Sequence, residues 1–190
     1  MKKCLFLGYK RKDTSIISNI EKERWIVSEW GNKKPNKKFY DYDLIISFGY
    51  KNIIKRSILD KCKNKIINLH ISYLPHNRGA HPNFWSFINN TPKGVSIHEM
   101  NTKIDEGNLI YRKKIKFKKN IDNFELSYKI LRKEIEKLFI KKIKYILNMS
   151  YKTKKINDKG SFNLKKSLPI FMSDWKVKIS TAKKLIKLIK

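Results

Sequence analysis

Two polar residues within an apolar run could do chemistry together. Asn68 and His70 lie two positions apart in KIINLHI at 65–71, so on a β-strand their side chains would share one face. Both types are disfavoured inside a buried strand, and an amide beside an imidazole can donate hydrogen bonds and carry a proton. A strand end at which polar residues meet water explains the pair equally well, and the local pattern leaves both interpretations open.

A turn aspartate and a long irregular loop follow this pair. Asp105 lies in a KIDEGN turn, where Asp and Gly are ordinary residues. The prolines and Gly79 of YLPHNRGAHPNFW predict a loop from Ser72 to Asn83, at the carboxyl end of the strand. Ligands of open α/β folds bind at that end, and such loops are often functional. Together these features favour one site that contains the pair and Asp105.

Strand and helix patterns alternate along the chain that must position these residues. Apolar runs predict strands at 3–9, 24–30, 43–50 and 65–71, and helical spacing appears at 15–20 and 53–62. A helical turn or short helix is expected at 83–88, and strands at 95–100 and 109–117 bracket Asp105. This alternation predicts an α/β fold with a mostly parallel sheet.

The clearest helix is expected to begin after Asp122. This residue is a good N-cap, Glu125 would complete a capping box, and Ile121 with Leu126 would form a hydrophobic staple. The apolar residues that follow at helical spacing are Phe124, Tyr128, Leu131, Ile135 and Leu138. We interpret this stripe as packing on the sheet rather than as a functional feature.

Length and composition indicate one folded domain. The 190 residues suit a single hydrophobic core with a short appendage. After residue 146 the chain becomes polar, then offers a strand-like segment and an amphipathic helical stretch at 181–190. Cys4 and Cys62 lie in apolar settings without ligand spacing, which predicts buried free thiols.

The formal net charge of +29 and the pI near 10.1 raise nucleic acid or an anionic membrane as partners. Lysine is spread over the whole chain and accompanies many isoleucines and asparagines, as codon bias in an AT-rich genome would produce. The positive field would still attract an anionic substrate. The CLFLGY run is shorter than a signal-peptide core of about 7–15 residues, and no run approaches the roughly 20 residues of a membrane span. We therefore expect a cytoplasmic location, no membrane partner, and no dedicated role for nucleic acid.

Residues 68–110 resemble the folate-dependent formyltransferase family. The family signature is an Asn-x-His pair, a Pro-x-x-Arg-Gly loop, a His-containing strand and an Asp-x-Gly turn. The corresponding segments here are 68–70, 75–79, VSIHEM with His98, and 105–107. The resemblance covers roughly residues 1–146 and implies a Rossmann-like formyltransferase fold, with a catalytic domain at 1–150 and a short C-terminal extension at 151–190.

The resemblance also implies a chemistry. The co-substrate 10-formyltetrahydrofolate would donate its formyl group to an amine through a tetrahedral intermediate. Asn68 and a protonated His70 would donate hydrogen bonds to the oxyanion, while Asp105 would orient His70 and help to carry the proton. No metal is needed, and the histidine spacings match no common zinc pattern.

The remaining site residues implied by the resemblance fall into two sets. Those expected beside the folate are Tyr50, Asn52, Ile53, Ile54, His98, Asn101, Lys103 and Ile104. Those expected beside the acceptor are His76, Arg78, His81 and Asn83. Arg78 is included because a guanidinium in a glycine-bounded loop suits an anionic substrate, with bracing of the loop as the alternative.

Three acceptors are compatible with the family: a nucleotide-linked amino sugar, initiator methionyl-tRNA and glycinamide ribonucleotide. LHISYLPHNRGAHPNFWSF, with its flanking segments, is most similar to N-formyltransferases that act on nucleotide-linked 4-amino-4,6-dideoxyhexoses for surface polysaccharides, with dTDP favoured over GDP. Fewer than 50 residues follow Ile146, which argues against the RNA-binding domain of the tRNA enzymes.

Two departures and one alternative class stay open. Phe162 and Asn163 replace the tyrosine and histidine of a GTYH-like stretch in these relatives, which puts the acceptor contacts of the tail in doubt. A non-catalytic, basic RNA-binding module on the same fold is the alternative from another class. Because relatives are often dimers, a homodimer is the expected oligomer.

Overall fold

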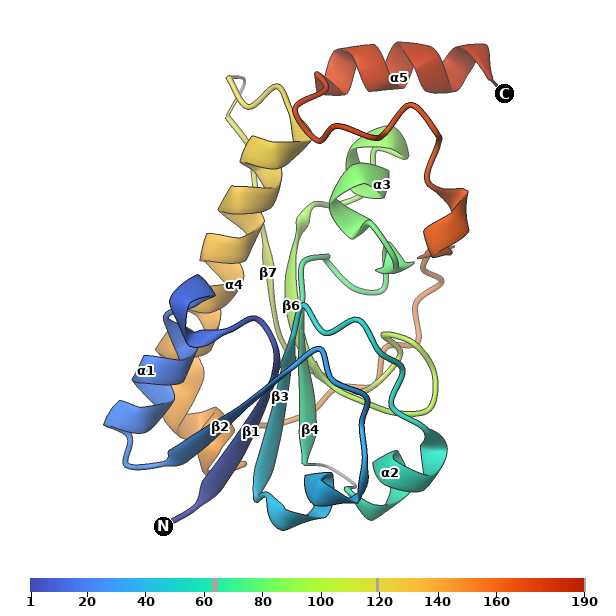
Figure 1. Cartoon of the computed structure of the whole chain (residues 1–190). Helices are drawn as coiled ribbons and strands as arrows, with labels where there is room; N and C mark the ends of the chain where they lie inside the picture. Colours follow the sequence, from blue (N-terminus) through green and yellow to red (C-terminus); the bar gives the residue numbers. More distant parts are fainter. Residues whose placement is uncertain (63–64, 119, 190) are drawn as a thin grey trace.

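One six-stranded sheet organises the molecule within residues 1–62, 65–118 and 120–189, the part described by the computed structural model (Figure 1). Its strand order is β2-β1-β3-β4-β6-β7. The strands are β1 (Lys3–Gly8), β2 (Ile26–Gly31), β3 (Leu44–Phe48), β4 (Ile66–His70), β6 (Gly94–Glu99) and β7 (Leu109–Lys114). β1 to β4 run parallel, and β6 is antiparallel to both of its neighbours. The predicted α/β fold with a mostly parallel sheet is confirmed.

Helices cover both faces of this sheet. α1 (Ile16–Lys22) and α4 (Phe124–Leu147) lie on one face, and α2 (Arg56–Lys61) lies on the other, as Figure 1 shows. Along β1 the side chains alternate between the two buried clusters: Phe6 faces α1 and α4, whereas Leu5 and Leu7 face the α2 side. Burial on both faces explains why the central strands β1 and β3 are continuous apolar runs in the sequence.

The start of α4 differs from the prediction. Asn123, not Asp122, is the N-cap, and its side-chain oxygen accepts a hydrogen bond from the Leu126 backbone at 2.9 Å. The Asp122 carbonyl instead accepts from the backbone N–H of Ile179, so a tertiary contact holds this residue outside the helix. The capping box with Glu125 is therefore wrong, and Leu126, 40% exposed, is not buried by a staple.

The apolar stripe predicted along α4 is confirmed. Phe124, Leu131 and Ile135 are almost completely buried, and Phe139 extends the stripe by one turn. Tyr128 is only partly buried, because its phenol reaches the cavity described below. The helix thus packs one face on the sheet and presents one polar group at the sheet's carboxyl edge.

The C-terminal segment lies against the loop that follows β4. β8 (Phe162–Asn163) pairs in parallel with β5 (Arg78–Gly79) inside that loop. α5 (Ile179–Leu188) packs on α3 (Pro82–Ile88) through a cluster that includes Phe84, Ile179 and Ile186. The helix expected at 181–190 therefore begins two residues earlier, and residue 190 lies outside the described residues. In the described part of the chain, every helix is too short or too polar to cross a membrane.

Both cysteines are buried free thiols, as expected. Burial raises the pKa of each thiol. Their packing is therefore that of small apolar side chains.

The cap of α4 gives a stability prediction. Replacement of Asn123 by Ala should lower the free energy of unfolding by about 0.5–2 kcal/mol, because the Leu126 N–H loses its acceptor. Asp122→Ala is the matched control, since the Asp122 contact to Ile179 is made by the backbone carbonyl, which alanine retains. The Asp122 carboxylate accepts a 3.2 Å hydrogen bond from Asn123 Nδ2, and its loss leaves the Asn123 oxygen that caps the helix in place. Urea denaturation measures both. An equal or larger loss in the Asp122 variant would contradict the assignment.

Candidate active site

A cavity of about 680 Å³ opens at the carboxyl edge of β1, β3 and β4. Ligand sites in open α/β sheets occupy this edge. Its wall is formed by Tyr9, by residues 47–54, 68–71, 79–82 and 100–105, by His98 and Tyr128, and by residues 162–165 of the C-terminal segment.

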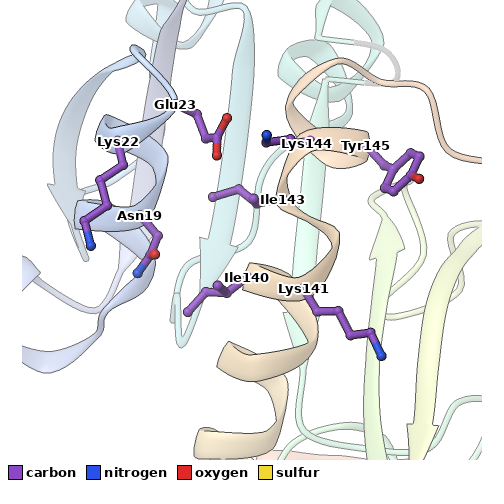
Figure 2. Close-up of a pocket in the computed structure, with 8 residues that line it drawn as sticks. All are labelled: Asn19, Lys22, Glu23, Ile140, Lys141, Ile143, Lys144 and Tyr145. Atoms are coloured by element: carbon purple, nitrogen blue, oxygen red, sulfur yellow. The ribbon is translucent and has the colours of Figure 1, made fainter.

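A second hollow, of about 330 Å³, lies between α1 and α4, away from this edge. Figure 2 shows Ile140 and Ile143 between the two helices, while Lys22 and Lys141 point away from one another. Its wall includes no histidine and none of the predicted site residues. The chemistry-bearing groups therefore belong to the larger cavity.

Asn68 and His98 are held side by side by the sheet register. They are direct partners in the β4 and β6 pairing, and Asn68 Nδ2 lies 3.2 Å from His98 Nε2. His98 Nδ1 lies 2.7 Å from the Glu99 carbonyl oxygen, which can only accept, so Nδ1 carries a proton. Nε2 faces two groups, the Asn68 amide and, at 3.5 Å, Asp105 Oδ1.

Asp105 completes this arrangement. Asn68 Nδ2 also donates to Asp105 Oδ1 at 3.1 Å, so the amide lies between the carboxylate and the His98 ring. Asp105 Oδ2 accepts from the Gly79 backbone N–H at 2.9 Å and lies 3.7 Å from His70 Nδ1. Asn68 and His70 thus both face the carboxylate of Asp105, which brings the three predicted catalytic residues together.

The turn that carries Asp105 has a specific geometry. Asp105 has a φ of 53°, a left-handed conformation that Asp tolerates better than most residues. A Cβ on Gly107 would lie 1.7 Å from the Glu99 carbonyl oxygen, so the close approach of turn and strand requires glycine. These two constraints explain the Asp-x-Gly spacing.

The protonation states follow from burial and charge. Burial lowers the pKa of His70, although the carboxylate of Asp105 opposes that shift, so the neutral ring is favoured. Burial by itself would raise the pKa of Asp105, but His70, His98 and the Gly79 N–H together hold it well below its ordinary range. Asp105 is therefore a buried, ionised carboxylate beside a neutral imidazole.

Asn77 supports His70 and was not predicted as a site residue. Its carbonyl oxygen lies 3.3 Å from His70 Nε2, and the residue is fully buried with a φ of 55°. Its amide donates to Thr91 Oγ1 at 2.7 Å, and its backbone N–H donates to Ser161 Oγ at 2.8 Å. An asparagine beside Arg-Gly in an irregular loop signals a left-handed residue, but not these contacts.

The eight residues expected beside the folate all lie in the cavity wall. They are Tyr50, Asn52, Ile53, Ile54, His98, Asn101, Lys103 and Ile104. Two of them are anchored to the segment after β2, since the Tyr50 hydroxyl donates to the Lys33 carbonyl at 2.6 Å and the Asn52 amide donates to the Asn32 carbonyl at 2.8 Å.

The four residues expected beside the acceptor are scattered. Only His81 lies in the cavity wall, stacked on Trp175 with ring centroids 5.6 Å apart. Arg78 forms an ion pair with Glu106 of the facing turn, which neutralises its charge. Asn83 is buried beneath α4, where its amide donates to the Phe124 carbonyl. His76 also lies outside the wall. Across the described ranges, no group of three or more His, Cys, Asp or Glu side chains could hold a metal ion.

Comparisons with known proteins point to one family. A family model described as Formyl transferase matches residues 5–143. The solved structure of the formyltransferase PseJ from Anoxybacillus kamchatkensis, in complex with UDP-4,6-dideoxy-4-formamido-L-AltNAc and tetrahydrofolate, superimposes with a TM-score of 0.85 at 34% identity. That match covers 94% of this chain and 96% of the other.

Two curated relatives match over shorter regions. The methionyl-tRNA formyltransferase of Finegoldia magna is 40% identical over 90 residues, which are 47% of this chain and 29% of that protein. The dTDP-4-amino-4,6-dideoxyglucose formyltransferase of Mycobacterium bovis is 30% identical over 128 residues, which are 66% of this chain and 52% of that protein. With the family model matched over most of the chain, the protein belongs to the formyl transferase family.

Proposed function

We propose that this protein transfers the formyl group of 10-formyltetrahydrofolate to the amino group of a nucleotide-linked 4-amino-4,6-dideoxy sugar. The observation that carries the proposal is that Asn68 and His70 both face the buried carboxylate of Asp105, in a cavity whose wall also holds the residues expected beside the folate. A cavity of about 680 Å³ is within the usual range for small-molecule sites.

The similarity to PseJ supports the sugar acceptor. That enzyme was crystallised with a UDP-linked formamido sugar and tetrahydrofolate, and the match spans nearly its whole length. We therefore favour UDP as the nucleotide over the dTDP expected from the sequence. Methionyl-tRNA is the second candidate, because the 40% identity to the Finegoldia enzyme is the higher local value, but that match spans only 29% of that enzyme.

In the proposed reaction, the amine of the acceptor attacks the formyl carbon. A C–N bond forms, negative charge develops on the carbonyl oxygen, and the bond from carbon to N10 of the folate then breaks. The Asn68 amide would stabilise the oxyanion, exchanging its contact with the His98 ring for a hydrogen bond to that oxygen.

Neutral His70 would accept the proton that the amine loses and return it to N10 of the leaving folate. With the ring proton on Nδ1, which faces Asp105, Nε2 would accept the proton of the amine in place of its 3.3 Å contact with the Asn77 carbonyl oxygen. The ionised carboxylate at 3.7 Å stabilises the imidazolium formed in this step. This role differs from the protonated oxyanion donor expected from the sequence, because burial lowers the pKa of His70.

Loss of His70 should reduce turnover strongly. We expect His70→Asn to lower kcat by about 10²–10⁴-fold, the usual contribution of a positioned acid or base, with the protein still folded by circular dichroism. His76→Asn is the matched control, because this histidine lies outside the cavity wall, and it should stay within about threefold of the parent. Near-normal kcat in the His70 variant would refute the role assigned to it.

The pH dependence separates the two roles of His70. If the neutral ring is the base, kcat/KM should hold near pH 7 and fall once the pH drops below 6.5, through the lowered pKa. Asp105→Asn should move this acid limb to still lower pH, since it removes the charge that opposes the shift. An oxyanion donor that must be protonated gives the opposite profile, with kcat/KM rising as the pH falls.

The acceptor can be tested directly. Purified protein with 10-formyltetrahydrofolate should formylate UDP-linked 4-amino-4,6-dideoxy sugars faster than their dTDP- and GDP-linked counterparts, with product detected by mass spectrometry. Methionyl-tRNA assayed in parallel should give no product. Turnover of the tRNA alone would establish the second candidate, and binding of RNA without any turnover would favour a non-catalytic module.

A further inference from the structure

The sheet divides the cavity wall into two sides. Tyr50, Ile54 and Met100 pack with the buried cluster on the α2 face, whereas Tyr9 and Ile71 pack with the cluster between the sheet and α4. The residues expected beside the folate at 50–54 and 100–104 adjoin the α2 side. If the folate occupies that side, the α4 side of the cavity is left for the acceptor.

Two tyrosines from distant segments meet on the α4 side. Tyr9 follows β1, and its ring packs edge-on against Phe48, with centroids 4.7 Å apart. A Cβ on Gly49 would lie 2.6 Å from that ring, so the ring rests directly on the backbone. Tyr128 belongs to α4, and its hydroxyl is hydrogen-bonded to that of Tyr9. Both side chains line the cavity.

Arg132 of α4 packs against the Tyr9 ring of this pair. It lies one turn after Tyr128 on α4, and its guanidinium lies over the Tyr9 ring, 4.1 Å from the centroid. It also donates to the Asp13 carbonyl and lies 3.6 Å from Glu136. The cation thus stacks on an aromatic face and fixes the ring that carries the Tyr9 hydroxyl.

A count of hydrogens shows an unused donor. Two phenols carry two hydroxyl hydrogens, and their mutual hydrogen bond uses one. Among the described residues neither oxygen has another hydrogen-bond partner. Burial raises the pKa of the Tyr128 hydroxyl, so it keeps its proton at neutral pH. One phenolic hydrogen therefore remains for a group in the cavity.

We propose that the Tyr9 and Tyr128 pair is a hydrogen-bonding subsite for the acceptor, which donates its free phenolic hydrogen to an oxygen of the nucleotide-linked sugar. The oxygen belongs either to a substituent of the sugar or to the diphosphate. The subsite rests on the proposed function and adds to it: it contacts the acceptor away from the reacting amine, so it contributes to binding rather than to proton transfer.

The test is steady-state kinetics of Tyr9→Phe, Tyr128→Phe and the double variant. The double variant should raise the KM for the nucleotide amino sugar about 5- to 10-fold, as expected for one hydrogen bond. Its kcat and its KM for the folate should stay within about twofold. Each single variant should have a smaller effect, because the remaining phenol can turn to the ligand. Tyr111→Phe, which lies outside the cavity wall, is the matched control.

The outcomes are distinguishable. An unchanged acceptor KM in the double variant, or an equal rise in the folate KM, would overturn the subsite while leaving the proposed function intact. Failure of the parent protein to formylate any nucleotide sugar would overturn both. If the double variant does not fold, at least one single variant must raise the acceptor KM more than twofold for the subsite to stand.

Calorimetric binding then identifies the oxygen. Weaker binding of UDP itself by the double variant assigns the hydrogen bond to the diphosphate, and weaker binding of the UDP-linked amino sugar alone assigns it to the sugar. Equal affinity of the double variant and the parent for both would overturn the subsite.

Discussion

The site depends on the hydrogen bonds and contacts that surround the buried carboxylate of Asp105. A buried charge is costly unless it is paired and hydrogen-bonded, and this one meets the Asn68 amide, the Gly79 N–H and two imidazoles. Those groups come from β4, from the loop after it and from β6. The need to satisfy one charge therefore brings three separate elements to the same point.

Part of this site follows from local pattern. The alternation along β4 places Asn68 and His70 on one face, and the two strands around Asp105 return its turn to them. The wall at 50–54 also follows, because it continues β3 at the edge where the parallel strands end. The wall at 100–104 does not follow from this rule, since it continues the antiparallel strand β6. The sequence pattern does not show whether Asp122 or Asn123 caps α4, because a tertiary backbone contact between Asp122 and Ile179 decides it.

The residues that were missed are joined across long separations. Tyr9 meets Tyr128 from 119 positions away, and Asn77 meets Ser161 from 84. Neither contact corresponds to a helix or strand periodicity in the sequence. Tyr128 in particular fits the apolar stripe of α4, so the sequence gives no sign that its hydroxyl meets another residue. Arg78 was expected at the substrate because of its charge, yet a carboxylate in the facing turn neutralises it. Charge alone does not say whether a guanidinium meets a ligand or its own chain.

Ser161 supports His70 indirectly, through Asn77. Ser161 Oγ accepts from the Asn77 backbone N–H, and the carbonyl of Asn77 faces the imidazole. β7 ends at residue 114 and α4 at residue 147, so the sheet and its main covering helix are synthesised before this support. A nascent chain on the ribosome can therefore build its core first, and the histidine acquires its final setting only after residue 161 has emerged.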